Sequence, residues 1–214
     1  MTHAPLIHPL PHPIDLLALQ QQAPERFPLL MESTASGTAQ GRWSLLLAAQ
    51  GDTLRLDADG CVRDQQDAVQ PGSFLQALDR AWQQARLPHD GSHSLPFRGG
   101  WALMLDYEVA SQIEPVLPAR ARDDGRPTAL ALRCPAAVLH DHQNHASFVI
   151  AEAGEQALLD SLVALAAQAL PEAGQGWQPP QSVGEDAPQR FTDGVRRVID
   201  YLRAGDVFQV NLSR

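Results

Sequence analysis

The sequence predicts an α+β fold in which antiparallel β-sheets pack together and helices lie at their periphery. Three observations lead to this prediction. Strand patterns follow one another through turn residues, with helical patterns at irregular places between them. The regular alternation of strand and helix that a doubly wound fold requires is missing. Hydrophobic residues make up 44% of the 214 positions, which is enough for a sizeable core.

In its first quarter the sequence predicts an arm, a helix and three strands. The arm covers residues 1–12, the helix 14–22, and the strands 27–33, 41–49 and 53–57, with a small polar loop at 34–40. Gly51-Asp52 is typical of a turn, and residues 53–57 alternate between apolar and polar. We therefore expect the last two strands to form an antiparallel pair with one apolar face.

The middle of the chain predicts a capped helix and then a set of strands. Ser73 is a suitable N-cap for a helix that runs to about Arg86. Gly99-Gly100, at the entrance to the strand 101–107, indicates a bulge or the close approach of another backbone. Further elements are a charged loop at 120–127, strands at 128–139 and 146–151 joined as a hairpin, and an amphipathic helix at 155–170.

We expect two domains separated by a linker. Residues 1–170 form the first domain, and the proline- and glycine-rich stretch 171–188 is the linker. Residues 189–214 then supply one helix and one strand, with Phe208, Val210 and Leu212 on one face. A single helix and strand cannot bury a core of their own. We therefore expect a truncated second domain.

The composition excludes several classes of function. A formal net charge of −9 disfavours nucleic acids and anionic membrane surfaces as partners. The chain contains no lysine, which excludes Schiff-base chemistry and a Walker A loop within these residues. Neither a signal peptide nor a long apolar span is visible, so we expect a cytoplasmic location.

One segment resembles a known family. The run from Tyr201 to Arg214, with Ala-Gly-Asp followed by Val-Phe-Gln-Val-Asn-Leu-Ser, is similar to the start of the catalytic domain in chorismate-binding enzymes. These include anthranilate synthase component I, aminodeoxychorismate synthase component I, and isochorismate and salicylate synthases. Residues 29–33, 41–44 and 95–108 resemble the N-terminal domain of the first two. The Pro-Phe-Arg-Gly-Gly segment within 95–108 is closer to the aminodeoxychorismate branch.

The resemblance implies a frame of two packed β-sheets with helices outside, and a tryptophan pocket inside it. The positions that match this pocket are Glu32, Ser33, Gln40, Gly41, Arg42 and Trp43. Glu32 and Ser33 can serve the ammonium group of an amino acid, and Trp43 can line an aromatic-sized cavity. A purely structural reading fits equally well, with Ser33 capping a strand end and Trp43 in the core.

The resemblance also implies the chemistry of the longer enzyme. Mg²⁺ would bridge downstream carboxylates to chorismate, and ammonia from a glutamine amidotransferase subunit would replace the 4-hydroxyl. The product would be 4-amino-4-deoxychorismate, on the route to para-aminobenzoate and folate. The family's catalytic lysine and metal-binding glutamates would lie beyond residue 214, so we expect no catalytic residue and no metal ligand in this chain, which alone should be inactive.

Three alternatives remain open at this point. The product could be that of anthranilate synthase, in the tryptophan pathway. The chain could be a stand-alone module that binds and senses an amino acid, or an α+β scaffold for protein interactions. The histidines at 140, 142 and 145 could bind a metal ion, but a solvated turn explains them better.

Overall fold

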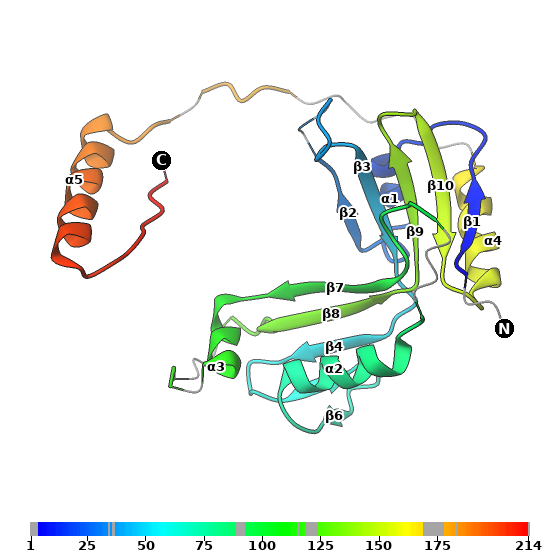
Figure 1. Ribbon diagram of the computed structural model, residues 1–214, viewed down its shortest axis with the longest axis horizontal. Helices are drawn as coiled ribbons and strands as arrows, with labels where there is room; N and C mark the ends of the chain where they lie inside the picture. The colour runs from blue at the N-terminus through cyan, green and yellow to red at the C-terminus, as the bar shows by residue number, and fades with distance from the viewer. Residues whose placement is uncertain are drawn as a thin grey trace. The chain divides into compact units, whose positions relative to one another are not determined.

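A computed structural model describes residues 4–33, 35, 37–88, 93–114, 116–118, 124–168, 178–182 and 184–213. The chain divides into two compact units, Met1–Glu172 and Ala173–Arg214, which are described separately (Figure 1). Residues 171–177 and 183 of the predicted linker 171–188 lie outside the described residues. Its extent, and that of a second domain, stays a prediction.

Among the described residues, the strands of the first unit form two five-stranded antiparallel sheets. The first sheet has the order β1-β10-β9-β3-β2. Its strands are β1 (Leu6–Pro9), β2 (Leu29–Met31), β3 (Trp43–Ala48), β9 (Ala136–Asp141) and β10 (Ala146–Ala151). Helices α1 (Leu16–Gln22) and α4 (Gln156–Ala166) pack against it, α4 beside β1 and β10 (Figure 1).

The second sheet has the order β6-β5-β4-β8-β7. Its strands are β4 (Thr53–Leu56), β5 (Val62–Asp64), β6 (Val69–Gln70), β7 (Gly100–Leu105) and β8 (Ala129–Cys134). Helix α2 (Phe74–Ala85) lies across it, and a short turn of helix, η1 (Tyr107–Val109) with α3 (Ala110–Ile113), follows β7 (Figure 1). The α+β class and the peripheral helices are thereby confirmed.

Three clusters of buried side chains form the core. The first, around Leu19, Phe27, Leu46 and Leu162, lies between the first sheet and helices α1 and α4. The second, around Phe74, joins α2 to the second sheet. The third joins the opposite face of the first sheet to residues of the second, so that the two sheets share a core.

The expected pairing of strands 41–49 and 53–57 is wrong. β3 pairs with β2 and β9 in the first sheet, whereas β4 pairs with β5 and β8 in the second. Ala48 lies opposite Ala136 and Thr53 lies opposite Leu132, so β3–β4 and β8–β9 are two long antiparallel segments that bend together from one sheet into the other. Residues 49–52 form the bend and not a hairpin turn, since Arg133 N–H donates to the carbonyl of Asp52 at 2.9 Å.

The same bend explains why the single strand expected over 128–139 is two strands. Pro135 separates β8 from β9 and has no N–H for a ladder bond. The hairpin between β9 and β10 is confirmed, with Asp141 opposite Ala146. Strands β5 and β6 and the helical turn η1–α3 have no counterpart in the sequence prediction.

The prediction is wrong at both ends of the chain: the structure has an unpredicted strand at the N-terminal end, and the strand predicted at the C-terminal end is not formed by the described residues. The N-terminal arm contains a strand, because β1 pairs with β10 and continues the first sheet. In the second unit, α5 (Pro188–Ala204) is confirmed and ends at Gly205 with φ +78°, but the described residues 205–213 form no strand. A strand is held by ladder bonds to a partner, and none pairs with this segment among the described residues.

The predicted N-cap of α2 is confirmed, whereas α1 begins at Leu16, two residues later than predicted, with Asp15 as its N-cap. The carboxylate of Asp15 accepts from Ala18 N–H at 3.0 Å. Ser73 accepts from Gln76 N–H at 3.2 Å, and the Gln76 side chain accepts in return from Ser73 N–H. No helix in the described part of the chain is both long and apolar enough to cross a membrane.

Candidate functional site

The six residues predicted to line a pocket gather at one end of the first sheet. β2 ends at Met31, which lies opposite Leu45 of β3. Because the two strands are antiparallel, the segment after β2 and the start of β3 meet at the same end of the sheet. Glu32 and Ser33 follow β2, while Arg42 and Trp43 stand where β3 begins.

Arg42 is bound to a buried carboxylate of the β9–β10 turn. Its Nε lies 3.1 Å from Asp141 Oδ1 and its Nη2 lies 2.6 Å from Oδ2. The Asp141 side chain is only 3% exposed. It also accepts from Gln143 N–H at 3.0 Å and from the Asn144 amide at 2.8 Å. These donors, Arg42 first among them, hold the pKa of Asp141 well below its usual value.

Trp43 faces the core between the two sheets. Its half-buried ring packs against the third cluster, on the same face of β3 as Leu45 and Leu47. The Arg42 guanidinium carbon lies 4.9 Å from the centroid of this ring. The Asp141 carboxylate and the Trp43 ring together hold the guanidinium of Arg42 in place. This favours a structural role for Arg42 and Trp43.

A cavity of about 290 Å³ opens beside Arg42. Its lining residues are Gly37, Thr38, Ala39, Gly41, Arg42, His142 and Gln143. The sequence prediction contained Gly41 and Arg42 but missed His142 and Gln143, which it assigned to a solvated turn. The hydrogen-bonded ladder between β3 and β9 brings these residues together, since Trp43 lies opposite Asp141.

The remaining predicted residues do not line this cavity. Glu32 and Gln40 are exposed. The hydroxyl of Ser33 accepts from Ala35 N–H at 3.2 Å and so stabilises the turn after β2. Of the six predicted residues, Gly41 and Arg42 therefore line the cavity, whereas Glu32, Ser33, Gln40 and Trp43 are not part of its lining.

The arrangement can bind a small polar group, but its serine–histidine pair offers no accessible nucleophile. Ser44 Oγ lies 2.7 Å from His142 Nε2, a pairing that resembles a nucleophile and its base. However, Ser44 is only 2% exposed, so its hydroxyl cannot reach a substrate. Within the described ranges, no three His, Cys, Asp or Glu side chains gather where they could hold a metal ion. These residues therefore offer no site for the Mg²⁺ that the resemblance implies.

Comparison with known proteins identifies relatives for most of the chain. Residues 29–214 match the family described as chorismate binding enzyme. Aminodeoxychorismate synthase component 1 of Streptomyces lividans is 25% identical over 202 residues, which cover 86% of this chain and 39% of the relative. Anthranilate synthase component 1 of Thermus thermophilus is 26% identical over 204 residues, covering 92% of this chain and 43% of the relative.

A solved structure shares the fold. Anthranilate synthase component I from Streptococcus pneumoniae superposes with a TM-score of 0.52 and 22% sequence identity, over 83% of this chain and 41% of that one. The chain spans about two-fifths of the length of each of these relatives.

Proposed function

Since the chain belongs to the family of chorismate-binding enzymes, we propose that it is the N-terminal part of an enzyme that aminates chorismate to 4-amino-4-deoxychorismate. The observation that carries this proposal is the family match over residues 29–214, which includes most of the two-sheet unit, from β2 onwards, and α5. In this proposal the described residues form a structural domain, and the catalytic residues of the enzyme lie outside them.

The choice of product rests on a short segment. Relatives from the aminodeoxychorismate and anthranilate branches match at 25% and 26% identity, so overall similarity favours neither. Residues 96–100, Pro-Phe-Arg-Gly-Gly, support the aminodeoxychorismate branch by resemblance. Anthranilate synthesis in the tryptophan pathway is the second candidate, and the match to the Thermus thermophilus protein favours it.

The proposal includes a metal ion, a partner and a compartment. Mg²⁺ would be held by residues other than those described, since these form no metal-binding group. A glutamine amidotransferase subunit would deliver ammonia, as the name "component 1" of both curated relatives supports. Para-aminobenzoate and folate synthesis would then proceed in the cytoplasm.

A product assay tests the proposed function. The protein encoded by the complete reading frame that contains this chain would be incubated with chorismate, MgCl₂ and ammonium chloride. We expect 4-amino-4-deoxychorismate by liquid chromatography and mass spectrometry, without the fluorescence of anthranilate. Anthranilate as the main product would reject the aminodeoxychorismate choice and leave the family assignment standing. Consumption of no chorismate would reject both candidate functions.

The same assay on the 214-residue chain alone tests the division of labour. We expect no product, because the chain holds no lysine and its described residues hold no metal-binding group. Amination of chorismate by the chain alone would contradict the proposal.

We also propose that the cavity beside Arg42 accepts an amino acid such as L-tryptophan. Its support is the cavity of about 290 Å³ at the predicted position, lined by Arg42 and the exposed His142 and Gln143. A stand-alone amino-acid-binding module would use the same cavity. Thermal unfolding with L-tryptophan should show stabilisation that D-tryptophan does not produce.

A pair of variants shows where the amino acid binds. Gln143→Ala removes one lining side chain but keeps the backbone N–H that Asp141 accepts from. Its response to L-tryptophan should weaken, whereas Gln84→Ala on the exposed side of α2 should respond like the unchanged chain. Equal responses of both variants would place the amino acid elsewhere.

A further inference from the structure

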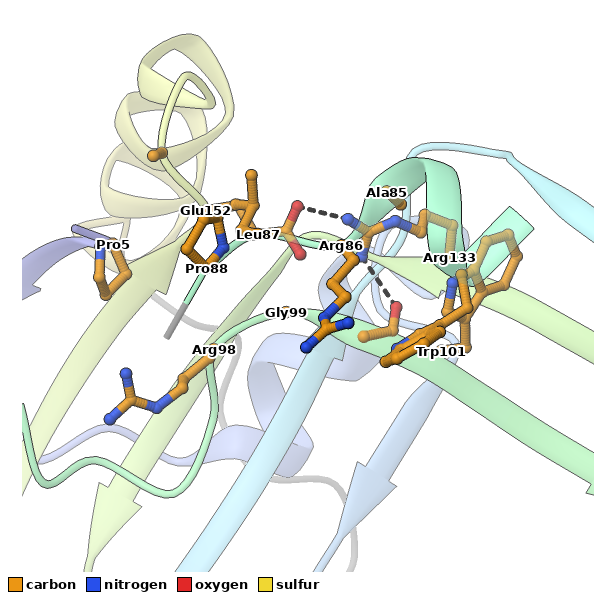
Figure 2. Close-up of a pocket in the computed structure, with 13 residues that line it drawn as sticks. Pro5, Ala85, Arg86, Leu87, Pro88, Arg98, Gly99, Trp101, Arg133 and Glu152 are labelled. Atoms are coloured by element: carbon orange, nitrogen blue, oxygen red, sulfur yellow. Dashed lines mark hydrogen bonds and ion pairs between the residues drawn. The ribbon is translucent and has the colours of Figure 1, made fainter. Parts of the chain in front are cut away.

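A second pocket lies where the two sheets meet, outside the site described above. It has a volume of about 230 Å³ and draws on the N-terminal arm, the end of α2, the entrance to β7, the end of β8 and the segment after β10 (Figure 2). Neither the sequence prediction nor the comparisons with relatives assign it a role. The lining residues come from positions 5 to 153 of the sequence. They meet where β8 of the second sheet is followed by β9 of the first.

One wall of the pocket is a buried ion pair. Arg133 Nη2 binds Glu152 Oε2, and Arg133 Nη1 donates to the Gly100 carbonyl at 2.9 Å (Figure 2). The side chains of Arg133 and Glu152 are 11% and 12% exposed. Burial raises the pKa of Glu152, although Arg133 opposes this. These bonds make the wall rigid.

Gly99 makes this wall possible. Its φ is +95°, and a Cβ at this position would lie 1.7 Å from Glu152 Oε1. The Glu152 carboxylate therefore lies directly against the glycine backbone. The close approach that the two glycines indicated is that of a side chain and not of another backbone.

The lining of the pocket also includes Arg86, an arginine that no carboxylate of the described residues engages. Arg86 follows the last residue of α2, and its guanidinium carbon lies 5.2 Å from the centroid of the Trp82 ring. Within the described part of the chain no Asp or Glu pairs with it. Figure 2 draws Arg86 among the residues that line the pocket, together with Arg133 and Trp101. This cation is free to bind an anion.

The charge of the lining is opposite to that of the whole chain. Arg86 and Arg133 face one carboxylate among the described lining residues, that of Glu152. The chain as a whole has a formal net charge of −9. A local excess of positive charge in an acidic protein attracts an anion to this place.

The rest of the lining is apolar and flat. The rings of Trp82 and Trp101 and the side chains of Leu87 and Pro88 border the pocket. The indole Nε1 of Trp101 is buried without an acceptor. Flat apolar surfaces beside a free guanidinium suit a ligand that has both a ring and an acid group.

From these observations we propose that the pocket binds a small aromatic carboxylate. Its carboxylate would pair with Arg86, and its ring would lie against the tryptophan rings. The volume limits the ligand to a single-ring molecule, because drug-sized ligands occupy pockets of about 300–1,000 Å³. The proposal does not depend on the proposed function, since it concerns a different set of residues.

Binding of benzoate to the 214-residue chain tests the proposal. The probe is titrated into ¹⁵N-labelled protein, and the indole N–H signals of the tryptophans are followed by NMR. We expect the signals of Trp82 and Trp101 to move in a saturable way and that of Trp43 to stay. Benzamide, which has the same shape without the charge, should bind at least about tenfold more weakly, because charge-assisted hydrogen bonds are roughly twice as strong as neutral ones.

Two matched variants on one helix complete the test. Arg86→Gln should weaken benzoate binding at least about tenfold, the loss expected when a charge-assisted pair is removed. Arg80→Gln, which changes an exposed arginine of α2 that lies outside the pocket, should bind benzoate like the unchanged chain. Circular dichroism would verify that both variants fold.

The result that overturns the proposal can take three forms. Binding of benzamide as tightly as benzoate would show that the pocket does not recognise charge. Displacement of benzoate by sulfate at equal concentration would show that the pocket is a general anion site. Unchanged benzoate binding by Arg86→Gln would show that the anion lies elsewhere.

Discussion

Two buried carboxylates illustrate how single residues shape this protein. Asp141 accepts from Arg42 and from the turn that follows it, so its charge is matched within hydrogen-bond distance. Glu152 has one arginine partner and lies against a glycine, so burial dominates its titration. The pKa of Asp141 is therefore lowered and that of Glu152 is raised. Titration of Asp141 thus makes the fold less stable as the pH falls, whereas titration of Glu152 makes it less stable as the pH rises.

Asp141→Asn should lower the free energy of unfolding by about 1–3 kcal/mol at pH 7, the usual cost of leaving buried donors poorly matched. Because the pKa of Asp141 is lowered in the fold, its stabilising effect is present above about pH 4, the unfolded value, and is lost as the pH falls further. Urea unfolding between pH 3 and 7 should show the variant and the unchanged chain converging in acid.

Asp160→Asn is the matched control, since Asp160 is exposed and its carboxylate accepts from the Gln156 amide of the same helix at 2.8 Å. Its effect should be small at every pH. A constant difference between Asp141→Asn and the unchanged chain from pH 3 to 7 would show that the lowered pKa does not contribute to stability.

Gly99→Ala should destabilise the first unit more than an ordinary glycine substitution does. Alanine at positive φ costs roughly 1–2 kcal/mol. At this position the new methyl would also displace Glu152 from Arg133, so we expect at least about 1 kcal/mol more, as in overpacked sites.

Gly60→Ala is the control for Gly99→Ala, because Gly60 has φ +80° and open space around it. The difference between the two variants in chemical unfolding isolates the effect of the Glu152 contact. Equal losses of stability would mean that Glu152 moves aside without cost.

At the scale of elements, local signals decide where helices begin, and long-range pairing decides which sheet a strand joins. Ser73 and Gln76 cap α2 through bonds within four residues. By contrast, β3 and β4 lie in different sheets because β3 pairs with β9 and β4 pairs with β8. A dipeptide such as Gly51-Asp52, which is typical of turns, can form a bend between two sheets as readily as the turn of a hairpin.

Ser73→Ala should cost about 1 kcal/mol of stability, the typical loss of an N-cap. Ser73→Asp should retain most of that stability, because its carboxylate can accept from Gln76 N–H and lies favourably at the positive end of the helix. Denaturant titrations of the three chains measure the difference. Similar losses for alanine and aspartate would mean that the capping bond contributes nothing.

At the scale of the molecule, the buried hydrophobic core belongs to the first unit. Every buried hydrophobic side chain of the described residues lies between Leu16 and Leu162. Helix α5 has no buried residue, and Ile199 and Leu202 on its apolar face are 39% and 41% exposed. The second unit therefore has little stability of its own, since a lone helix of this length is marginal in water.

Removal of residues 173–214 should leave the thermal unfolding of the first unit almost unchanged. We expect the midpoint of residues 1–172 to lie within about 4 °C of that of the whole chain, a shift that corresponds to about 1 kcal/mol. Calorimetry measures both midpoints. A fall well beyond this range would show that the second unit contributes to the stability of the first.

The sequence by itself determined the α+β class, the helices α1, α2, α4 and α5, and the family. Periodicity and capping are local properties, and the family motif is a contiguous run of residues. Of the six residues predicted to line a tryptophan pocket, only Gly41 and Arg42 line the cavity at the start of β3.

Only the tertiary structure decided how these parts combine. It paired Arg42 with Asp141 and Arg133 with Glu152, placed β3 and β4 in different sheets, and assembled the pocket around Arg86 and Trp101. The physical reason is that ladder bonds and ion pairs join residues by register across strands, and one sequence without relatives aligned to it carries no signal for that register.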